Sequence, residues 1–110
     1  MVSIMNVGTI EDKFVKKVDD DVAERIVSVK INGKIVSKIE YERADKSMWI
    51  LSALTLDNHK NQGHMTRLVR WLCQQNVECI SPGIYLEEGE LYLKHVLERE
   101  STKKGIKILE

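Results

Sequence analysis

The stretch ILSALTLDNHKNQGHMTRLVRWL, residues 50–72, joins an apolar run, a polar turn and a periodic helix in close succession. In its second half, apolar residues recur at i, i+3, i+4, i+7 and i+8, namely Met65, Leu68, Val69, Leu72 and Cys73. This spacing places them on one stripe of an α-helix, whereas Arg67 and Arg70 project elsewhere. We therefore expect a helix that packs its apolar stripe on a sheet.

The residues before the turn indicate the sheet that this helix covers. In residues 48–56, apolar side chains occur at both odd and even positions, so both faces of a strand formed there would be apolar. This is typical of a central strand covered on both faces. Upstream, Asn32-Gly33 lies between two β-branched runs and favours a type I′ hairpin turn. After that turn, alternation predicts one face with Ile35, Ser37, Ile39 and Tyr41, and the other face with Val36, Lys38 and Glu40.

Shorter elements are expected toward both ends of the chain. Residues 77–86 predict a strand interrupted by Ser81-Pro82-Gly83, and residues 105–109 predict a closing strand. Residues 87–100 predict a second helix with a buried edge of Leu93, Val96 and Leu97. In the first 24 residues, 2–10 and 13–18 are compatible with edge strands, and 19–25 with a turn or a single helical turn.

This order of elements predicts an α/β (α+β) fold. A hairpin that leads into a strand-helix-strand crossover gives a mixed, mainly antiparallel central sheet with helices packed on its faces. The crossover places the turn at residues 57–64 at the carboxyl end of the central strand, where open α/β sheets usually bind ligands.

Composition limits the class of protein. The 110 residues suffice for one domain over 1–110, and 17 basic residues balance 17 acidic ones, so we do not expect a nucleic-acid partner without a local basic patch. The sequence predicts neither a membrane span nor a secretion signal. Cys73 and Cys79 do not form a CxxC pair, and we expect reduced thiols in a cytoplasmic protein.

The turn before the helix has the properties of an anion site. A helix N-terminus presents unpaired backbone N–H groups and a partial positive charge, and glycine allows close approach of a ligand. Gly63 would supply that approach and Lys60 a full positive charge. The alternative is that Gly63 serves only a tight turn. The sequence contains neither the GxxxxGK[ST] nor the GxGxxG pattern.

The turn resembles that of the GNAT superfamily of acyl-CoA-dependent N-acetyltransferases. The family signature R/Q-x-x-G-x-G/A is matched by KNQGHM, residues 60–65, with Lys60 in place of Arg or Gln and Met65 in place of a small residue. The resemblance implies an acetyltransferase-like fold that binds acetyl-CoA along the central strand and at the turn. The implied coenzyme-binding residues are Leu54, Thr55, Leu56, Lys60, Asn61, Gln62, Gly63, His64 and Met65.

The resemblance also implies catalytic candidates for transfer of an acetyl group to an amine acceptor. GELYLKHV, residues 89–96, is similar to the family segment whose tyrosine protonates the departing thiolate, which makes Tyr92 the general acid. Glu40 is a candidate base for the incoming amine, and a water relay is the alternative. The side chain of Met65 either obstructs the phosphate or faces the core.

The sequence also allows interpretations other than an enzyme. We expect His59 and His64 to be exposed turn residues that bind no metal, and Cys73 to belong to the core. Arg67 and Arg70 either help to bind a phosphate or form a solvated helix face. The chain could instead be a non-catalytic interaction module, or a small inhibitor or adaptor that docks through a sheet edge or the acidic residues 19–21. Pairing of an edge strand would give a homodimer.

Overall fold

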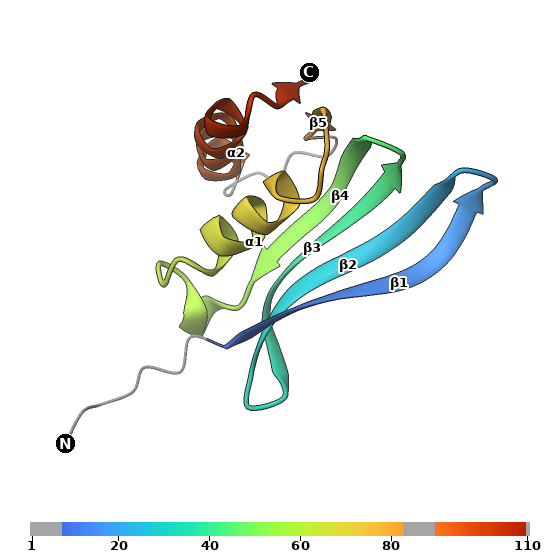
Figure 1. Ribbon diagram of the computed structural model, residues 1–110. Coiled ribbons are helices and arrows are strands. Elements are labelled where there is room, and N and C mark those ends of the chain that lie inside the picture. The colour runs from blue at the N-terminus through green and yellow to red at the C-terminus, as the bar shows by residue number, and fades with distance from the viewer. Residues whose placement is uncertain (1–7, 83–89, 110) are drawn as a thin grey trace.

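The computed structural model describes residues 8–82 and 90–109, and in that part a mixed sheet carries two helices (Figure 1). The sheet has the order β1-β2-β3-β4-β5-β6. The elements are β1 (Thr9–Asp19), β2 (Val22–Ile31), β3 (Lys34–Ala44), β4 (Ser47–Thr55), the short 3₁₀ helix η1 (Asp57–His59), α1 (His64–Cys73), β5 (Cys79–Ser81), α2 (Glu90–Lys104) and β6 (Lys107–Ile108).

The first four strands form an antiparallel meander. Asn32 and Gly33 both have positive φ, 53° and 78°, which confirms the primed turn predicted between β2 and β3. The acidic residues 19–21 end β1 and turn the chain into β2, so the turn predicted over residues 19–25 is confirmed only at its start, and residues 22–25 belong to β2. The ambiguous N-terminal part is thus one long edge strand from residue 9 onward, and residues 2–7 of the predicted first strand lie outside the described residues.

Both helices lie on the same face of the sheet. β4 pairs in parallel with β5, and β5 pairs in parallel with β6, so the two crossovers step in the same direction. Right-handed crossovers that step in one direction place their helices on one face. α1 and α2 accordingly contact each other, and α1 packs over β2 and β3. The mixed sheet with packed helices is confirmed, and the two helices share one of its faces.

The core lies between the helices and this single face. The predicted stripe of α1 is confirmed, with Met65 partly buried at its edge. The predicted buried edge of α2 is confirmed as well. The fully buried members of the core come from β2, β3, β4, β5 and α1: Val27, Val29, Ile39, Ile50, Leu68, Val69, Leu72 and Ile80.

The central position of β4 is confirmed, but its predicted cover on both faces was wrong. Met48 and Ile50 are buried under the helices, whereas Trp49 between them is 39% exposed. Leu54 is 52% exposed, next to Ala53 that packs on the core. An apolar run has no alternation to show which of its faces is covered, and neither of the described helices lies on the second face.

A β-bulge corrects the faces predicted for the start of β3. Val29 pairs with Ser37 and Lys30 with Ile35, so Val36 is an extra residue on β3. The extra residue breaks the alternation. Ile35, predicted on the face of Ile39 and Tyr41, is exposed, and Val36 is buried in its place.

The C-terminal elements differ from prediction in their bounds. α2 extends to Lys104, beyond the predicted end at residue 100, and ends before Gly105, whose φ of 69° suits a helix terminus. The predicted start at residues 87–89 lies outside the described residues, as do residues 83–86 of the strand predicted at 77–86. The closing strand is confirmed as β6. Within the described residues, the helices are too short or too polar to cross a membrane.

A polar network links β1 to the two strands beside it. The Asp12 carboxylate on β1 accepts a hydrogen bond from Tyr41 Oη at 2.7 Å and one from Arg25 Nε at 2.8 Å. Tyr41 is 1% exposed, and burial followed by the Asp12 contact raises its pKa. One carboxylate thus links three adjacent strands.

We expect Asp12→Ala to lower the free energy of unfolding by about 2–4 kcal/mol, because it leaves the buried Tyr41 hydroxyl and Arg25 without their acceptor. Urea denaturation measures the change. Glu11→Ala is the matched control, since its ion pair with Lys30 at 3.0 Å is exposed and should be worth less than about 1 kcal/mol. Equal losses in the two variants would contradict a structural role for the network.

Candidate functional site

On the side of β4 that faces β5, most of β4 has no partner among the described strands. β4 and β5 pair only from Ser47 to Trp49, opposite Cys79 to Ser81. The next residue on that chain is Pro82, which lacks the N–H group that would continue the ladder. No other described strand pairs with Ile50–Thr55 on this side. As far as the described strands show, Ile50–Thr55 therefore have backbone groups on this side that an extended ligand could pair with.

A second bulge lies where the open part of β4 begins. On β3, Glu40 and Tyr41 are adjacent, but their partners on β4 are Ser52 and Ile50, so Leu51 is an extra residue. A bulge leaves its extra residue unpaired in the ladder and re-aims the neighbouring backbone groups. Leu51 thus lies beside the point at which β5 separates from β4.

The open edge leads directly into the N-terminus of α1. After β4 the chain makes η1 and a turn in which Asn61 has φ of 62° and Gly63 has φ of 82°. Gly63 is the N-cap of α1, and as a glycine it has no side chain that could cap the helix. A Cβ atom at Gly63 would meet nothing within 4 Å, so the space in front of the turn is open. This geometry suits an anion.

The charge at this turn is partly balanced. Lys60 Nζ lies 3.1 Å from Asp57 Oδ1, and both side chains are more than half exposed. An exposed pair of this kind contributes less than about 1 kcal/mol, so a ligand anion can compete with Asp57 for Lys60. Gln62 donates to the Asn58 carbonyl at 3.4 Å, which holds the amide side chain over the turn.

His64 is buried, so its predicted exposure was wrong. It is 4% exposed, and its ring centroid lies 6.1 Å from that of His59, which is half-buried. His64 precedes Leu68 by four positions and so belongs to the same helical stripe, a signal present in the sequence.

The contacts of His64 fix its protonation. Its Nε2 lies 3.1 Å from Gln62 Oε1, which can only accept, so Nε2 carries the proton. Nδ1 of His64 and Nδ1 of His59 are buried without a hydrogen-bond partner among the described residues. Burial, and then Arg67 and His59, lower the pKa of His64, which keeps the ring neutral. Within residues 8–82 and 93–109 no three His, Cys, Asp or Glu side chains are grouped to hold a metal ion.

The remaining coenzyme candidates lie around the turn. The Met65 side chain is partly buried against the core, so of the two alternatives the structure shows the one that leaves the turn open. Thr55 Oγ1 is 2.8 Å from Ser37 Oγ, and the Leu56 amide donates to the Val36 carbonyl at 2.9 Å. Leu54 points away from the helices.

A hollow that the sequence analysis did not predict lies beside these residues. Its volume is about 230 Å³, and it lies on the uncovered face at the end of β4. Its lining residues are Ile35, Val36, Ser37, Lys38, Leu54 and Leu56. The bulge at Val36 that turns Ile35 outward contributes to this surface, which is why alternation alone does not predict it.

The two catalytic candidates are placed differently. Tyr92 is a residue of α2, and the structure describes its backbone but not its side chain. Glu40 lies opposite Ser52 on β4, and its Oε1 accepts from Lys38 Nζ at 3.0 Å. That hydrogen bond lowers the pKa of Glu40, which favours the carboxylate and weakens it as a base. Cys73 is buried as expected, and burial raises its pKa to about 11.

Comparison with known proteins supplies no relative for this chain. No protein-family model matches it, and neither does any curated protein or solved structure.

Acid should destabilise the protein through His64. Because its pKa is lowered in the folded state, the unfolded chain binds more protons once the pH falls below about 6.5, and stability then decreases toward the folded-state pKa. We expect His64→Leu to flatten the dependence of the unfolding free energy on pH between about 7.5 and 5.5.

His95→Gln is the control for this measurement, because His95 is an exposed residue of α2. Denaturation by urea at each pH gives the slope, which does not depend on the absolute stability of either variant. A slope that His64→Leu leaves unchanged would contradict the assignment.

Proposed function

We propose that this protein is an acetyl-CoA-dependent N-acetyltransferase that acts on an amine acceptor. The observation that carries the proposal is the part of β4 that no described strand pairs with on the side of β5, which leads on to the N-terminus of α1 at Gly63. An extended molecule with amide groups at one end and phosphates at the other fits this arrangement. Acetyl-CoA has that composition, and the resemblance of residues 60–65 to the GNAT turn supports the same ligand.

The two halves of the coenzyme would use different parts of the site. The pantetheine amides would pair with the backbone of Ile50–Thr55, a segment about 20 Å long at the usual rise of a strand. The pyrophosphate would accept hydrogen bonds from the turn at residues 60–65, where the helix dipole and Lys60 favour negative charge. Asp57 would release Lys60 on binding, at small cost.

The proposed reaction is direct attack of the amine on the thioester. A neutral amine forms the C–N bond at the thioester carbon, the carbon–sulfur bond breaks, and the coenzyme leaves as a thiolate that takes up a proton. The unpaired backbone amide expected at the Leu51 bulge would stabilise the oxyanion. Tyr92 is the proton donor by resemblance, and a water relay rather than the paired Glu40 would remove the proton of the ammonium.

A non-catalytic interaction module is the second candidate. Two ion pairs favour it: Lys60 is engaged by Asp57, and Glu40 by Lys38. A fold with an acetyltransferase-like turn does not by itself require activity. In that case the open edge of β4 would bind a strand of a partner protein, by the same backbone pairing.

Calorimetric titration with acetyl-CoA tests the proposal. We expect a dissociation constant on the order of micromolar, and loss of binding in Gly63→Trp, whose side chain fills the space in front of the turn. Gly33→Trp is the matched control, because Gly33 has φ of 78° and equally open surroundings but lies in the β2–β3 hairpin.

The two glycine variants carry a similar backbone strain, so only the place of the side chain differs. Binding lost in Gly63→Trp and kept in Gly33→Trp assigns the coenzyme to the turn. An absence of heat at millimolar acetyl-CoA in the unaltered protein rejects the enzyme and directs attention to protein partners.

Once an acceptor amine is found, Tyr92→Phe tests the general acid. Removal of the hydroxyl should lower kcat by about 100-fold while the KM for acetyl-CoA changes little, because the proton is needed after binding. Release of free thiol measures the rate. An unchanged kcat would exclude Tyr92 from proton transfer.

A further inference from the structure

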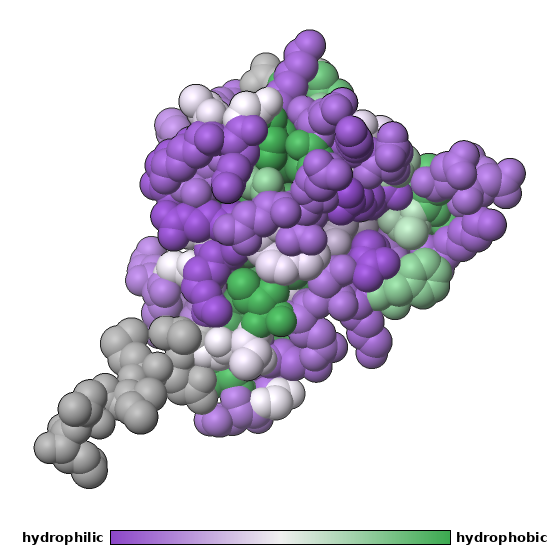
Figure 2. All heavy atoms as spheres, viewed as in Figure 1, coloured by the Kyte–Doolittle hydropathy of each residue, from purple (hydrophilic) through white to green (hydrophobic). Residues whose placement is uncertain are grey.

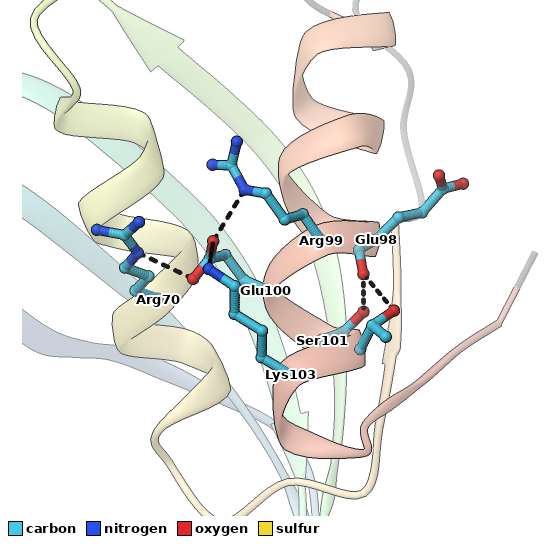
Figure 3. A network of polar contacts seen from close by, with 7 residues as sticks. Arg70, Glu98, Arg99, Glu100, Ser101 and Lys103 are labelled. Carbon is cyan, nitrogen blue, oxygen red and sulfur yellow. Dashed lines mark hydrogen bonds and ion pairs between the residues drawn. The ribbon is translucent and has the colours of Figure 1, made fainter.

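One buried carboxylate organises the surface where α1 meets α2. Glu100 on α2 is 5% exposed and accepts hydrogen bonds from three cations (Figure 3). Arg70 Nε of α1 lies 2.9 Å from it, Arg99 Nε 3.0 Å and Lys103 Nζ 3.2 Å. The hydrogen bond from Arg70, with smaller contributions from the other two, lowers the pKa of Glu100 to about 2. The carboxylate is therefore charged at neutral pH.

The three cations exceed this one anion by two charges. We call Arg70, Arg99 and Lys103 the cationic cluster; their side chains are 51%, 53% and 57% exposed. The nearby Glu98 carboxylate points away from the cluster in Figure 3, so it does not offset the excess. The surface seen in Figure 2 is largely hydrophilic over both helices, and small hydrophobic areas appear beside them.

Arg70 and Arg99 each have hydrogen-bond donors that Glu100 does not use. Each contacts Glu100 through Nε, and the outer nitrogens of both guanidinium groups point away from Glu100 (Figure 3). No described residue accepts a hydrogen bond from these outer nitrogens at either arginine. A guanidinium group is planar and suits bidentate binding of a carboxylate. Because Glu100 fixes the positions of both side chains, less conformational entropy is lost when a ligand binds.

We propose that the cationic cluster is a docking surface for an acidic segment of a partner protein. Two planar guanidinium groups and one ammonium group can bind several carboxylates of a short acidic peptide. Two uncompensated charges are few for a nucleic acid, which is held through many phosphates, and the chain as a whole has no net charge. The cluster lies on the helix surfaces, apart from the turn at residues 60–65, so docking does not depend on the coenzyme.

An NMR titration with a capped acidic peptide of four glutamates and one aspartate tests this surface. At about 20 mM salt we expect shifts of the backbone amides in the C-terminal halves of α1 and α2, and weaker binding at about 200 mM because exposed charges are screened. The matching peptide of glutamines and asparagine should produce no shifts.

Variants distinguish the cluster from the general charge of the surface. Arg70→Gln with Arg99→Gln should weaken binding at least about tenfold, which corresponds to 1.4 kcal/mol or more. Arg43→Gln is the matched control, since Arg43 also bonds through Nε, to the Asp45 carbonyl, but stands on β3. It should change affinity less than about twofold.

Because loss of two partners of Glu100 can unfold the protein, a second pair of variants keeps the charges. Arg70→Lys with Arg99→Lys preserves the ion pairs with Glu100 but removes the planar guanidinium groups. This double variant should weaken peptide binding about threefold. Affinity unaltered in a folded double variant would overturn the proposal, as would an absence of shifts at millimolar peptide. Tighter binding of a single-stranded RNA at the same amides would overturn it in favour of a nucleic acid.

Discussion

Burial of one stripe of α1 against β2 and β3 is the interaction on which the rest of this structure depends. Leu68, Val69 and Leu72 are completely buried there. The stripe fixes both ends of the helix: its N-terminus at Gly63 lies at the end of β4, and its last turn brings Arg70 to α2. The proposed coenzyme site and the proposed docking surface are thus two ends of one well-packed element.

Because the helices cover a single face of the sheet, other contacts must stabilise the edge strand β1 and the opposite face. β1 is an edge strand, and Asp12 ties it to Arg25 and Tyr41 by hydrogen bonds. The uncovered face leaves Trp49 and Leu54 exposed. Lys38 and Glu40 pair with each other on that face, which satisfies two charges on an otherwise half-exposed surface.

The proposed active site depends on backbone more than on side chains. The part of β4 without a described partner, the bulge at Leu51 and the turn at Gly63 offer amide and carbonyl groups in fixed positions. Preorganised dipoles of this kind stabilise charge without reorganisation. His64 contributes differently, since its neutral ring fills the space under the turn and holds Gln62.

The sequence alone determined the local elements, because their signals are local. The periodicity of α1, the Asn32-Gly33 turn and the central position of β4 all follow from short-range spacing. It also pointed to the turn at residues 60–65 as an anion site. Tertiary structure decided which face of the sheet the helices cover, where the bulges at Val36 and Leu51 fall, and that Arg70 meets the buried Glu100. These features depend on strand register and on contacts between residues 30 positions apart, and no local pattern contains that information.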